Sequence, residues 1–274
     1  MSDSTVTARF IERGSHRIFV LAHRPAARSG RAVLIAPPFA EEMNKTRRML
    51  SEAGRELAAR GVATVLPDLR GTGDSSGEFG DADWESWRGD LRAAAEWSAA
   101  EGWPVAALLG VRAGCILGAQ FARELPRALT RTVFWQPVID GERYLRQFLR
   151  LRVAASMMGG VGESAGGLRA RLAGGEPLEV SGYLLSPRMA EQLAALRLTD
   201  VTGIGLGYVH WMEVGRAPGS ALAPESQRAV DAMRAGGLAV AICTAQSEPF
   251  WSSTEIVTVP ELISATVNAL GAAP

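Results

Sequence analysis

The sequence of 274 residues has few of the side chains on which common catalytic and metal sites depend. Its three histidines, His16, His23 and His210, leave little material for a metal cluster or for general-base chemistry. Its two cysteines, Cys115 and Cys243, form no CxxC pair and are too few for a disulfide framework in a chain of this length. The sequence therefore points to no metal and no cofactor, and we expect both thiols to be reduced and buried.

An excess of charge and long apolar runs are lacking as well. The 29 basic residues are balanced by 29 acidic ones, whereas binding to nucleic acid needs a clustered basic excess, so we expect no nucleic-acid partner. No stretch reaches the roughly 18 apolar residues that span a membrane, and the N-terminal segment lacks the apolar core of a secretory signal. These absences predict a cytoplasmic protein, and the 47% of apolar residues predicts a folded one.

Apolar runs that predict buried strands alternate with stretches of helical periodicity. The predicted strands are residues 31–37, 62–69, 105–110, 132–136, 203–214, 238–244 and 255–259. The predicted helices are residues 43–60, 84–100, a helix that Pro126 terminates after Leu125, residues 224–235 and a helix from Pro260. This alternation indicates an α/β fold, with a mostly parallel sheet covered by helices on both faces. The rhythm breaks over residues 141–199, which we expect to form a cap-like insertion on a core made of residues 1–140 and 200–274.

Three stretches resemble the α/β-hydrolase fold, and one of them carries an unusual residue. They are LIAPPF (34–39), DLRGTGDSSG (68–77) and LLGVRAGCILG (108–118). The last has the frame of the G-x-S-x-G nucleophile elbow, but Arg112 stands in place of the serine. A guanidinium has a pKa above about 12 and cannot act as a nucleophile.

The other members of a catalytic triad are missing from the places that this resemblance implies. The loop of residues 246–254, where a catalytic histidine would lie, contains none. Glu213 is the nearest candidate for the acid, but an acid without a histidine to orient has no triad role. His210 could approach the site from its strand, although a satisfied or solvent-facing histidine is the favoured interpretation. Cys115 is disfavoured as a substitute nucleophile, because it lies three residues past the elbow and is expected to point into the fold.

A narrower resemblance covers most of the chain. The segments that carry it are PPFAEEMNKTRRML, DLRGTGDSSGEF, DADWESWRGDL, LLGVRAGCILGA, FWQPVIDGERYLRQFLRLRVA and PFWSSTEI. They resemble the proteins called exosortase A system-associated hydrolases of the second type, whose elbow is also of the G-x-R-x-G kind. The resemblance implies a place among the proteins of exopolysaccharide production and PEP-CTERM sorting. The word hydrolase in that name follows the fold and is not evidence of turnover.

A planar cation at the elbow suggests a binding site. There Arg112 would project over the sheet at the N-terminus of the next helix, whose free N–H groups favour an anion. Glu41 or Glu42 could pair with it, and Asn44, Arg47 and Arg48 would share one face of the following helix, unless they form only a solvated helix start. We therefore expect a small anionic or carbohydrate-related ligand. The candidate binding residues are Phe39, Glu41, Glu42, Asn44, Lys45, Arg48, Arg112, Ala113, Gln136, Arg143 and Trp251.

The insertion begins with an amphipathic basic helix in which Arg143, Arg146 and Arg150 recur at helical spacing. It could be a cap helix that turns its arginines over the pocket. It could instead be a segment, residues 141–155, that contacts an anionic membrane surface or a protein, or a surface helix docked by its apolar side. The sequence also leaves open whether the glycine-rich residues 159–167 form an ordered loop or a lid.

Three hypotheses of function follow from these features. The first is a hydrolase-fold protein without its triad that binds the ligand at Arg112. The second is a hydrolase of an ester, thioester or amide, in which Glu41, Glu42 or Glu213 activates water and Arg112 stabilises the oxyanion; its difficulty is that a neighbouring arginine lowers the pKa that a general base needs raised. The third is a non-catalytic interaction module whose contact surface is the insertion with its arginine-bearing helix, with a homodimer as one form of that contact.

Overall fold

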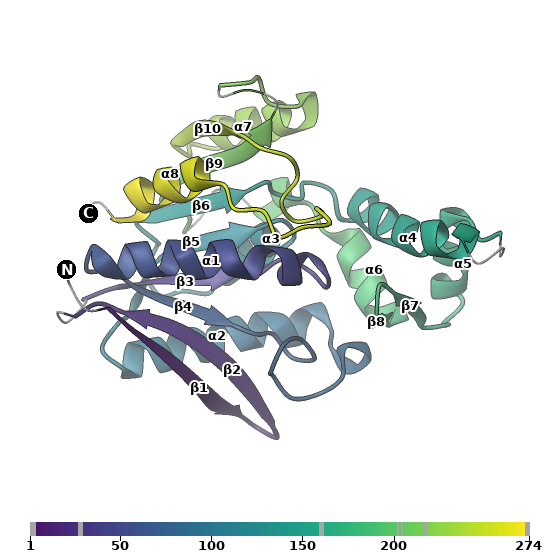
Figure 1. Ribbon diagram of the computed structural model, residues 1–274, viewed down its shortest axis with the longest axis horizontal. Coiled ribbons are helices and arrows are strands. Elements are labelled where there is room, and N and C mark those ends of the chain that lie inside the picture. Colours follow the sequence, from purple (N-terminus) through teal and green to yellow (C-terminus); the bar gives the residue numbers. More distant parts are fainter. Residues whose placement is uncertain are drawn as a thin grey trace.

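The structure is a computed structural model that describes residues 4–26, 30–158, 162–201, 205–215 and 219–271, together with Gly203 and Ala217. Its centre is an eight-stranded sheet with the strand order β1-β2-β4-β3-β5-β6-β9-β10 (Figure 1). The strands are β1 Thr5–Arg13, β2 His16–Arg24, β3 Ala32–Ala36, β4 Ala63–Pro67, β5 Val105–Val111, β6 Arg131–Trp135, β9 Tyr208–Gly215 and β10 Val240–Gln246. The pairs β1–β2 and β2–β4 are antiparallel, and the other five pairs are parallel.

The chain runs from β3 to β4 on one side and then returns to β5 on the other side of β3. In an open α/β sheet such a reversal leaves a crevice outside the carboxyl ends of the two strands, where ligands bind. The topology therefore singles out the loops that follow β3 and β5.

Helices cover both faces of the sheet, because its parallel strands are apolar on both sides. The helices α1 (Glu42–Ala59) and α8 (Pro260–Gly271) lie on one face, and α2 (Trp84–Ala100), α3 (Gly114–Ala122) and α7 (Pro224–Ala235) lie on the other (Figure 1). Alternate residues of β3 divide between the two cores: Val33 and Ile35 pack under α1 and α8, and Leu34 and Ala36 pack under α2 and α3.

Residues 141–201 form a separate group of elements beside the carboxyl ends of the parallel strands (Figure 1). The group contains α4 Gly141–Met158, α5 Ala165–Ala173, the hairpin β7 Leu178–Val180 and β8 Tyr183–Leu185, α6 Pro187–Ala195 and the 3₁₀ helix η2 Leu198–Val201. A further 3₁₀ helix, η1 (Phe79–Asp81), precedes α2. Tyr144 and Phe148 of α4 pack edge-on against Phe39 after β3, with ring centroids 6.1 and 5.3 Å apart. The group thus shares one apolar core with the sheet.

Most of the predicted elements are confirmed, since each forms within a few residues of its expected position. The helix expected over residues 84–100 has those bounds, because Asp83 and Ser86 form a reciprocal capping box at its start. Residues 224–235 are also confirmed, and both stretches bury the apolar side that their periodicity indicates. In the described part of the chain, no helix combines the length and the apolar character needed to cross a membrane.

Two predicted elements are wrong in their type or end point, and two other regions had no firm prediction. Residues 255–259 form no strand, and β10 is the last strand that the structure describes in the sheet. The helix after the elbow ends at Ala122, three residues before Leu125, because its last N–H groups bond three residues back instead of four. The antiparallel hairpin β1–β2 was not predicted. Of the glycine-rich residues 159–167, the first three lie outside the described residues, and the last three belong to α5.

Candidate functional site

Arg112 occupies the sharp turn between β5 and α3, at the carboxyl edge of the sheet beside the strand reversal. Its φ is +54°, a left-handed conformation that is strained for a side chain with a Cβ atom. Its N–H donates to the carbonyl of Trp135 at 2.9 Å, which ties the turn to β6. A Cβ atom on Gly114 would lie 2.3 Å from the carbonyl oxygen of Ala36, so the turn requires glycine at that position.

The guanidinium of Arg112 lies nearly enclosed among polar and aromatic groups, with 12% of the side chain exposed. Its Nε donates to Glu42 Oε1 at 3.1 Å, and its Nη1 donates to the carbonyl of Gln136 at 3.1 Å. The cation lies 4.5 Å from the ring centroid of Trp251 and 5.6 Å from that of Tyr144, both within the range of a cation–π contact. Among the described residues, Nη2 has no hydrogen-bond partner.

The partner of Arg112 is the buried carboxyl of Glu42, one of the two acids expected to pair with it. Burial raises the pKa of Glu42, and the charge of the neighbouring Arg112 opposes that rise. Burial alone would lower the pKa of Arg112, but Glu42 raises it above its usual value, so the guanidinium stays charged. The second oxygen of Glu42 is buried and lacks a hydrogen-bond partner in the described structure.

Glu41 supplies a second unusual carboxyl next to this pair. Burial, reinforced by the charge of Glu42, raises the pKa of Glu41 from 4.5 to about 7. Arg112 lowers it, but less than burial and Glu42 together raise it. Its Oε2 is buried and lacks a hydrogen-bond partner among the described residues. At neutral pH this carboxyl is therefore close to half protonated, and it can donate a hydrogen bond as well as accept one.

Two small cavities meet at Arg112, and Tyr144 and Gln147 of α4 also line both. The first has a volume of about 140 Å³ and is completed by Glu41, Glu42, Phe148, Leu151, Trp251 and Ser252. The second has a volume of about 170 Å³ and is completed by Gln136, Pro137, Val138, Ile139, Asp140, Arg143, Ala223, Glu225 and Ser226. The guanidinium thus borders one aromatic, acidic cavity and a second cavity with a mixed lining of apolar, polar and charged residues.

The structure brings together six of the residues predicted for the site. Glu41, Glu42, Arg112, Gln136, Arg143 and Trp251 all line one or both cavities. Gln136 has a φ of +43°, and its side-chain oxygen accepts from the N–H of Val214 at 3.0 Å, which fixes the carbonyl that receives Arg112. Glu41, Arg112 and Gln136 follow the carboxyl ends of β3, β5 and β6, which is why they converge.

The other basic and amide residues after β3 point elsewhere. Asn44 donates to the Tyr183 hydroxyl at 3.2 Å, and Lys45 donates to the carbonyl of Thr254 at 2.8 Å. Arg47 pairs with Asp68, and Arg48 pairs with Glu52 one turn along α1. None of these four side chains lines either cavity, because successive positions of α1 turn away from the strand ends.

The remaining candidate residues either belong to the apolar core or lie away from Arg112. Phe39 and Ala113 are each 1% exposed, so their side chains belong to the core. Glu213 accepts from the indole N–H of Trp211 at 2.7 Å and lines neither cavity. His210 is the third residue of β9 and borders a different cavity with Arg131 and Tyr208. It therefore does not approach the elbow.

Cys115 is buried, and its Sγ lies 3.8 Å from the carbonyl oxygen of Trp135. Burial raises the pKa of this thiol well above its usual value, so it stays protonated and inert. Cys243 is only partly buried, against the expectation of two buried thiols, because β10 is an edge strand of the sheet.

Tyr144, Gln147 and Phe148 are site residues that the sequence analysis did not select. The sequence predicts an amphipathic helix here, but periodicity does not reveal which element its apolar side faces. Only the docking of α4 against Phe39 shows that the helix closes the site.

Backbone donors are also available at the elbow. Within the described residues, the N–H groups of Phe39 and Ala113 have no intramolecular hydrogen-bond acceptor. In a nucleophile-elbow fold, the N–H of the residue after the elbow position and an N–H from the loop after β3 form the oxyanion hole. These two groups lie at the corresponding positions of this chain.

Comparison with known families and structures agrees with this geometry. The family model described as "Serine aminopeptidase, S33" matches residues 27–169. No curated protein sequence matches the chain.

Solved structures extend the likeness over nearly the whole chain. Est1E from Butyrivibrio proteoclasticus with bound ferulic acid superposes with a TM-score of 0.71 at 14% identity, covering 95% of this chain and 97% of that one. The esterase domain of a Rhodothermus marinus protein gives 0.64 at 17% identity, covering 97% and 96%. A fungal esterase from Rhizomucor miehei gives 0.60 at 15% identity, covering 98% and 82%. At these identities the likeness shows the fold, which is that of the α/β hydrolases.

Proposed function

The chain belongs to the serine aminopeptidase S33 family, and from that premise we propose that its elbow binds one end of a sugar-containing ligand instead of attacking an acyl group. A guanidinium that never loses its proton stands at the nucleophile position. The loop of residues 246–254 contains no histidine, and no histidine lines either cavity at Arg112. A serine-type mechanism therefore has neither its nucleophile nor its base.

The arrangement of charges favours a hydroxyl-rich ligand over an anion. One guanidinium faces the two carboxyl groups of Glu41 and Glu42, so an added anion would meet repulsion wherever both carboxyls are ionised. Hydroxyl groups match the available partners, because the carboxyl oxygens accept from them and Nη2 of Arg112 donates to them. Trp251 offers an aromatic surface for the apolar face of a sugar ring.

The observation that carries this proposal is the pair of buried carboxyl oxygens without partners among the described residues, on Glu41 and Glu42, at a cavity that Arg112 also lines. Buried polar groups without partners cost about 1–3 kcal/mol each, and a ligand that supplies hydrogen bonds recovers part of that cost. Both cavities are smaller than the roughly 300–1,000 Å³ of typical small-molecule sites. The site therefore holds the end of a ligand and does not enclose a large one.

A role in exopolysaccharide assembly or PEP-CTERM sorting is part of the proposal. It rests on the resemblance to exosortase-associated hydrolases, whose elbow also carries arginine. A site that binds a sugar end fits a process whose intermediates are glycans.

Active-site labelling with a fluorophosphonate, alongside turnover of p-nitrophenyl esters, tests the loss of serine chemistry. We expect neither labelling nor turnover above that of the heat-denatured protein. Robust labelling that persists in Arg112→Ala would overturn the proposal, because it would reveal a nucleophile elsewhere.

Sugar binding is tested by isothermal titration with a panel of monosaccharides and short glycans. We expect Trp251→Ala to weaken any binding about tenfold or more, since it removes an aromatic contact at the site. The matched control, Trp97→Ala, removes a partly buried tryptophan of α2 that packs on Trp103, a residue just after that helix. Equal affinity for every sugar in wild type and Trp251→Ala would contradict the proposed site.

A second function, hydrolysis of an ester, thioester or amide by activated water, is favoured by two specific observations. Glu41 has a pKa of about 7, close to the value that suits a general base at neutral pH. The unpaired N–H groups of Phe39 and Ala113 stand where an oxyanion would form. If a substrate panel reveals turnover, Glu41→Gln should abolish it with folding intact, and unchanged turnover would remove Glu41 from the mechanism.

A further inference from the structure

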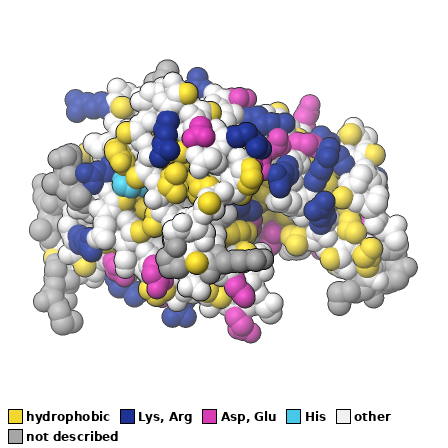
Figure 2. All heavy atoms as spheres, turned by 90° about the horizontal axis from the view of Figure 1, so that it is seen from above, with side chains coloured by type: hydrophobic (Ala, Val, Ile, Leu, Met, Phe, Trp, Pro, Cys, Tyr) yellow, Lys and Arg dark blue, Asp and Glu magenta, His cyan; other side chains and the backbone are white. Residues whose placement is uncertain are grey.

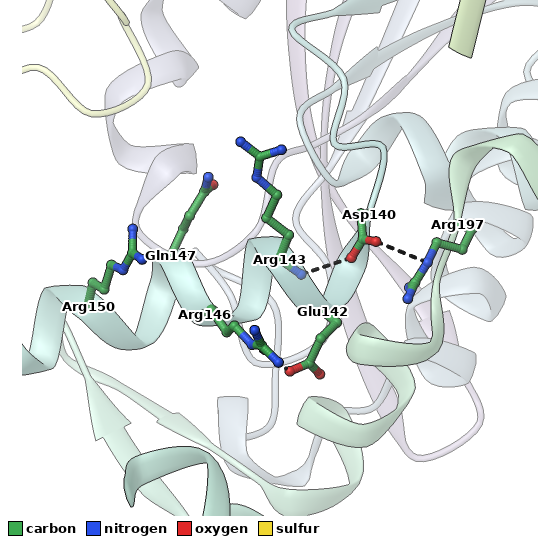
Figure 3. Close-up of a pocket in the computed structure, with 7 residues that line it drawn as sticks. All are labelled: Asp140, Glu142, Arg143, Arg146, Gln147, Arg150 and Arg197. Atoms are coloured by element: carbon green, nitrogen blue, oxygen red, sulfur yellow. Dashed lines mark hydrogen bonds and ion pairs between the residues drawn. The ribbon is translucent and has the colours of Figure 1, made fainter. Parts of the chain in front are cut away.

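A third cavity of about 390 Å³ opens on the outer side of α4 (Figure 3). Its walls are unusually basic, with Arg143, Arg146 and Arg150 from α4 and Arg197 from the segment after α6. Asp140, Glu142 and Gln147 complete the lining. The space-filling view shows a concentration of Lys and Arg side chains on the part of the molecule that contains α4 (Figure 2).

The pairing of these side chains leaves positive charge in excess. Arg146 Nε contacts Glu142 at 3.0 Å, and Arg197 Nε contacts Asp140 at 3.2 Å. Arg143 pairs with Glu225, which lies outside this cavity's lining. Arg150 is exposed and has no partner among the described residues. Arg150 is therefore the one lining guanidinium without a carboxylate partner among the described residues, and the four lining guanidinium groups outnumber the two lining carboxylates.

This basic cavity and the site at Arg112 share lining residues along α4. Gln147 lines the basic cavity and both cavities at the guanidinium. Arg143 lines the basic cavity and the compartment beside Gln136. In Figure 3 the side chains of Arg143 and Gln147 extend to the same side of the helix. One helical turn therefore joins a basic region to a region that is acidic and aromatic.

We propose that the two regions form one site for a phosphorylated sugar, with the phosphate or diphosphate at Arg143, Arg146 and Arg150 and the sugar at Arg112. This inference rests on the sugar site proposed above and adds the class of the ligand. A phosphate monoester carries about −1.5 to −2 charges at neutral pH, and the lining has more guanidinium groups than carboxylates to attract it. Guanidinium groups suit it because their planar N–H donors pair with phosphate oxygens.

The distribution of charge between the two regions determines how the ligand is oriented. A phosphate would be repelled from Glu41 and Glu42, whereas the arginines of α4 attract it. A neutral sugar gains nothing from excess charge but can satisfy the partnerless oxygens of the inner site. The phosphate therefore lies outermost, and the sugar end is inserted past Gln147 toward Trp251.

Titration calorimetry of the full chain tests this inference with three kinds of probe. They are the 1-phosphates of glucose, galactose, mannose and N-acetylglucosamine, the four free sugars, and inorganic phosphate. We expect at least one sugar phosphate to bind about tenfold or more tightly than either its free sugar or phosphate. Arg150→Gln should weaken that binding about tenfold, since it removes a charge-assisted contact. The matched control is Arg9→Gln, an exposed arginine of β1 without partners in the described structure.

The possible outcomes separate this inference from the proposed function. Binding weakened by both Arg150→Gln and Trp251→Ala supports one joint site. Binding weakened by Trp251→Ala but not by Arg150→Gln overturns the joint site and leaves the sugar site standing. Binding weakened by Arg150→Gln but not by Trp251→Ala overturns both the joint site and the proposed sugar site. If Arg9→Gln weakens sugar phosphate binding as much as Arg150→Gln does, the inference is overturned, because the binding then reflects general electrostatic attraction.

A membrane surface presents phosphate groups too, so vesicles form a separate arm of the experiment. The chain is mixed with vesicles of phosphatidylglycerol and, separately, of phosphatidylcholine, and sedimented. Sedimentation with phosphatidylglycerol that Arg150→Gln abolishes, without binding of any sugar phosphate, would overturn the inference in favour of membrane contact. If the chain binds a sugar phosphate but does not sediment with either kind of vesicle, the inference is supported.

Discussion

At the scale of single residues, the elbow combines a strained backbone with a buried charge. Arg112 adopts a left-handed backbone conformation, and it brings a charge into a nearly closed site. The conformation follows from the sharp strand-to-helix turn, and the charge is compensated by Glu42 and by the rings of Trp251 and Tyr144. Each feature can be isolated by a substitution.

The backbone strain at residue 112 should make the glycine and alanine variants differ in stability. Both Arg112→Ala and Arg112→Gly remove the guanidinium and leave Glu42 without its partner, but only alanine retains a Cβ atom at a φ of +54°. We therefore expect the glycine variant to be more stable than the alanine variant by about 1 kcal/mol. Urea denaturation monitored by tryptophan fluorescence measures the difference. An alanine variant as stable as the glycine variant would mean that the turn relaxes when the arginine is gone.

The raised pKa of Glu41 should appear in the pH dependence of stability. Between 4.5 and about 7 the folded state holds a proton that the unfolded state has released, so the free energy of unfolding falls as pH rises through that window. Glu41→Gln cannot ionise, so relative to wild type it should gain about 1–3 kcal/mol from pH 5 to pH 8. Urea denaturation across that range measures the gain. The exposed Glu248→Gln is the control, and parallel profiles for wild type and Glu41→Gln would contradict the shift.

At the scale of elements, the site depends on close contact between the elbow and the end of β3. Gly114 allows α3 to start directly against the carbonyl groups of Ala36 and Pro37. This contact fixes the helix start behind Arg112, and α4 covers the site from the other side. The inner face of α4 carries Tyr144 and Phe148, and its outer face carries the arginines.

Gly114→Ala should therefore be strongly destabilising. Its Cβ atom would lie 2.3 and 2.4 Å from two backbone oxygens, which a flexible side chain could avoid but the backbone cannot. We expect a loss of about 2–4 kcal/mol in the free energy of unfolding. Gly166→Ala is the matched control, since its Cβ atom meets nothing within 4 Å and alanine favours the first turn of α5. A loss below 1 kcal/mol for Gly114→Ala would show that the elbow tolerates a wider turn.

At the scale of the whole molecule, one apolar core extends from the sheet into residues 141–201. Phe39 after β3 contacts Tyr144 and Phe148 of α4, and Leu168, Leu185 and Met189 of the insertion belong to the same cluster. Elements that share a core unfold together, because removing one exposes the apolar surface of the other. The insertion is thus expected to be part of one cooperative unit.

Phe148→Ala tests this cooperativity. The side chain is 3% exposed, so we expect its truncation to cost about 3–5 kcal/mol. Calorimetry should show a single transition at a lower Tm, in both wild type and variant. Two separate transitions, one of them unaffected by the substitution, would mean that residues 141–201 unfold independently of the sheet. Leu151→Ala, at a position 40% exposed on the same helix, should lower Tm much less.

The sequence by itself determined the parallel sheet, the helices on its two faces and the elbow with Arg112, because periodicity and turn glycines act locally. It also brought Glu41, Glu42, Gln136 and Trp251 to the site, since residues at the carboxyl ends of neighbouring parallel strands must converge. Only the tertiary structure decided which acid pairs with Arg112, that Asn44 and Arg48 turn away, and that Tyr144 and Gln147 close the site. These outcomes depend on the rotation of α1 and the docking of α4, which are fixed by packing between residues far apart in the chain. The raised pKa of Glu41 has the same origin, because it is burial by those distant elements that makes ionisation costly.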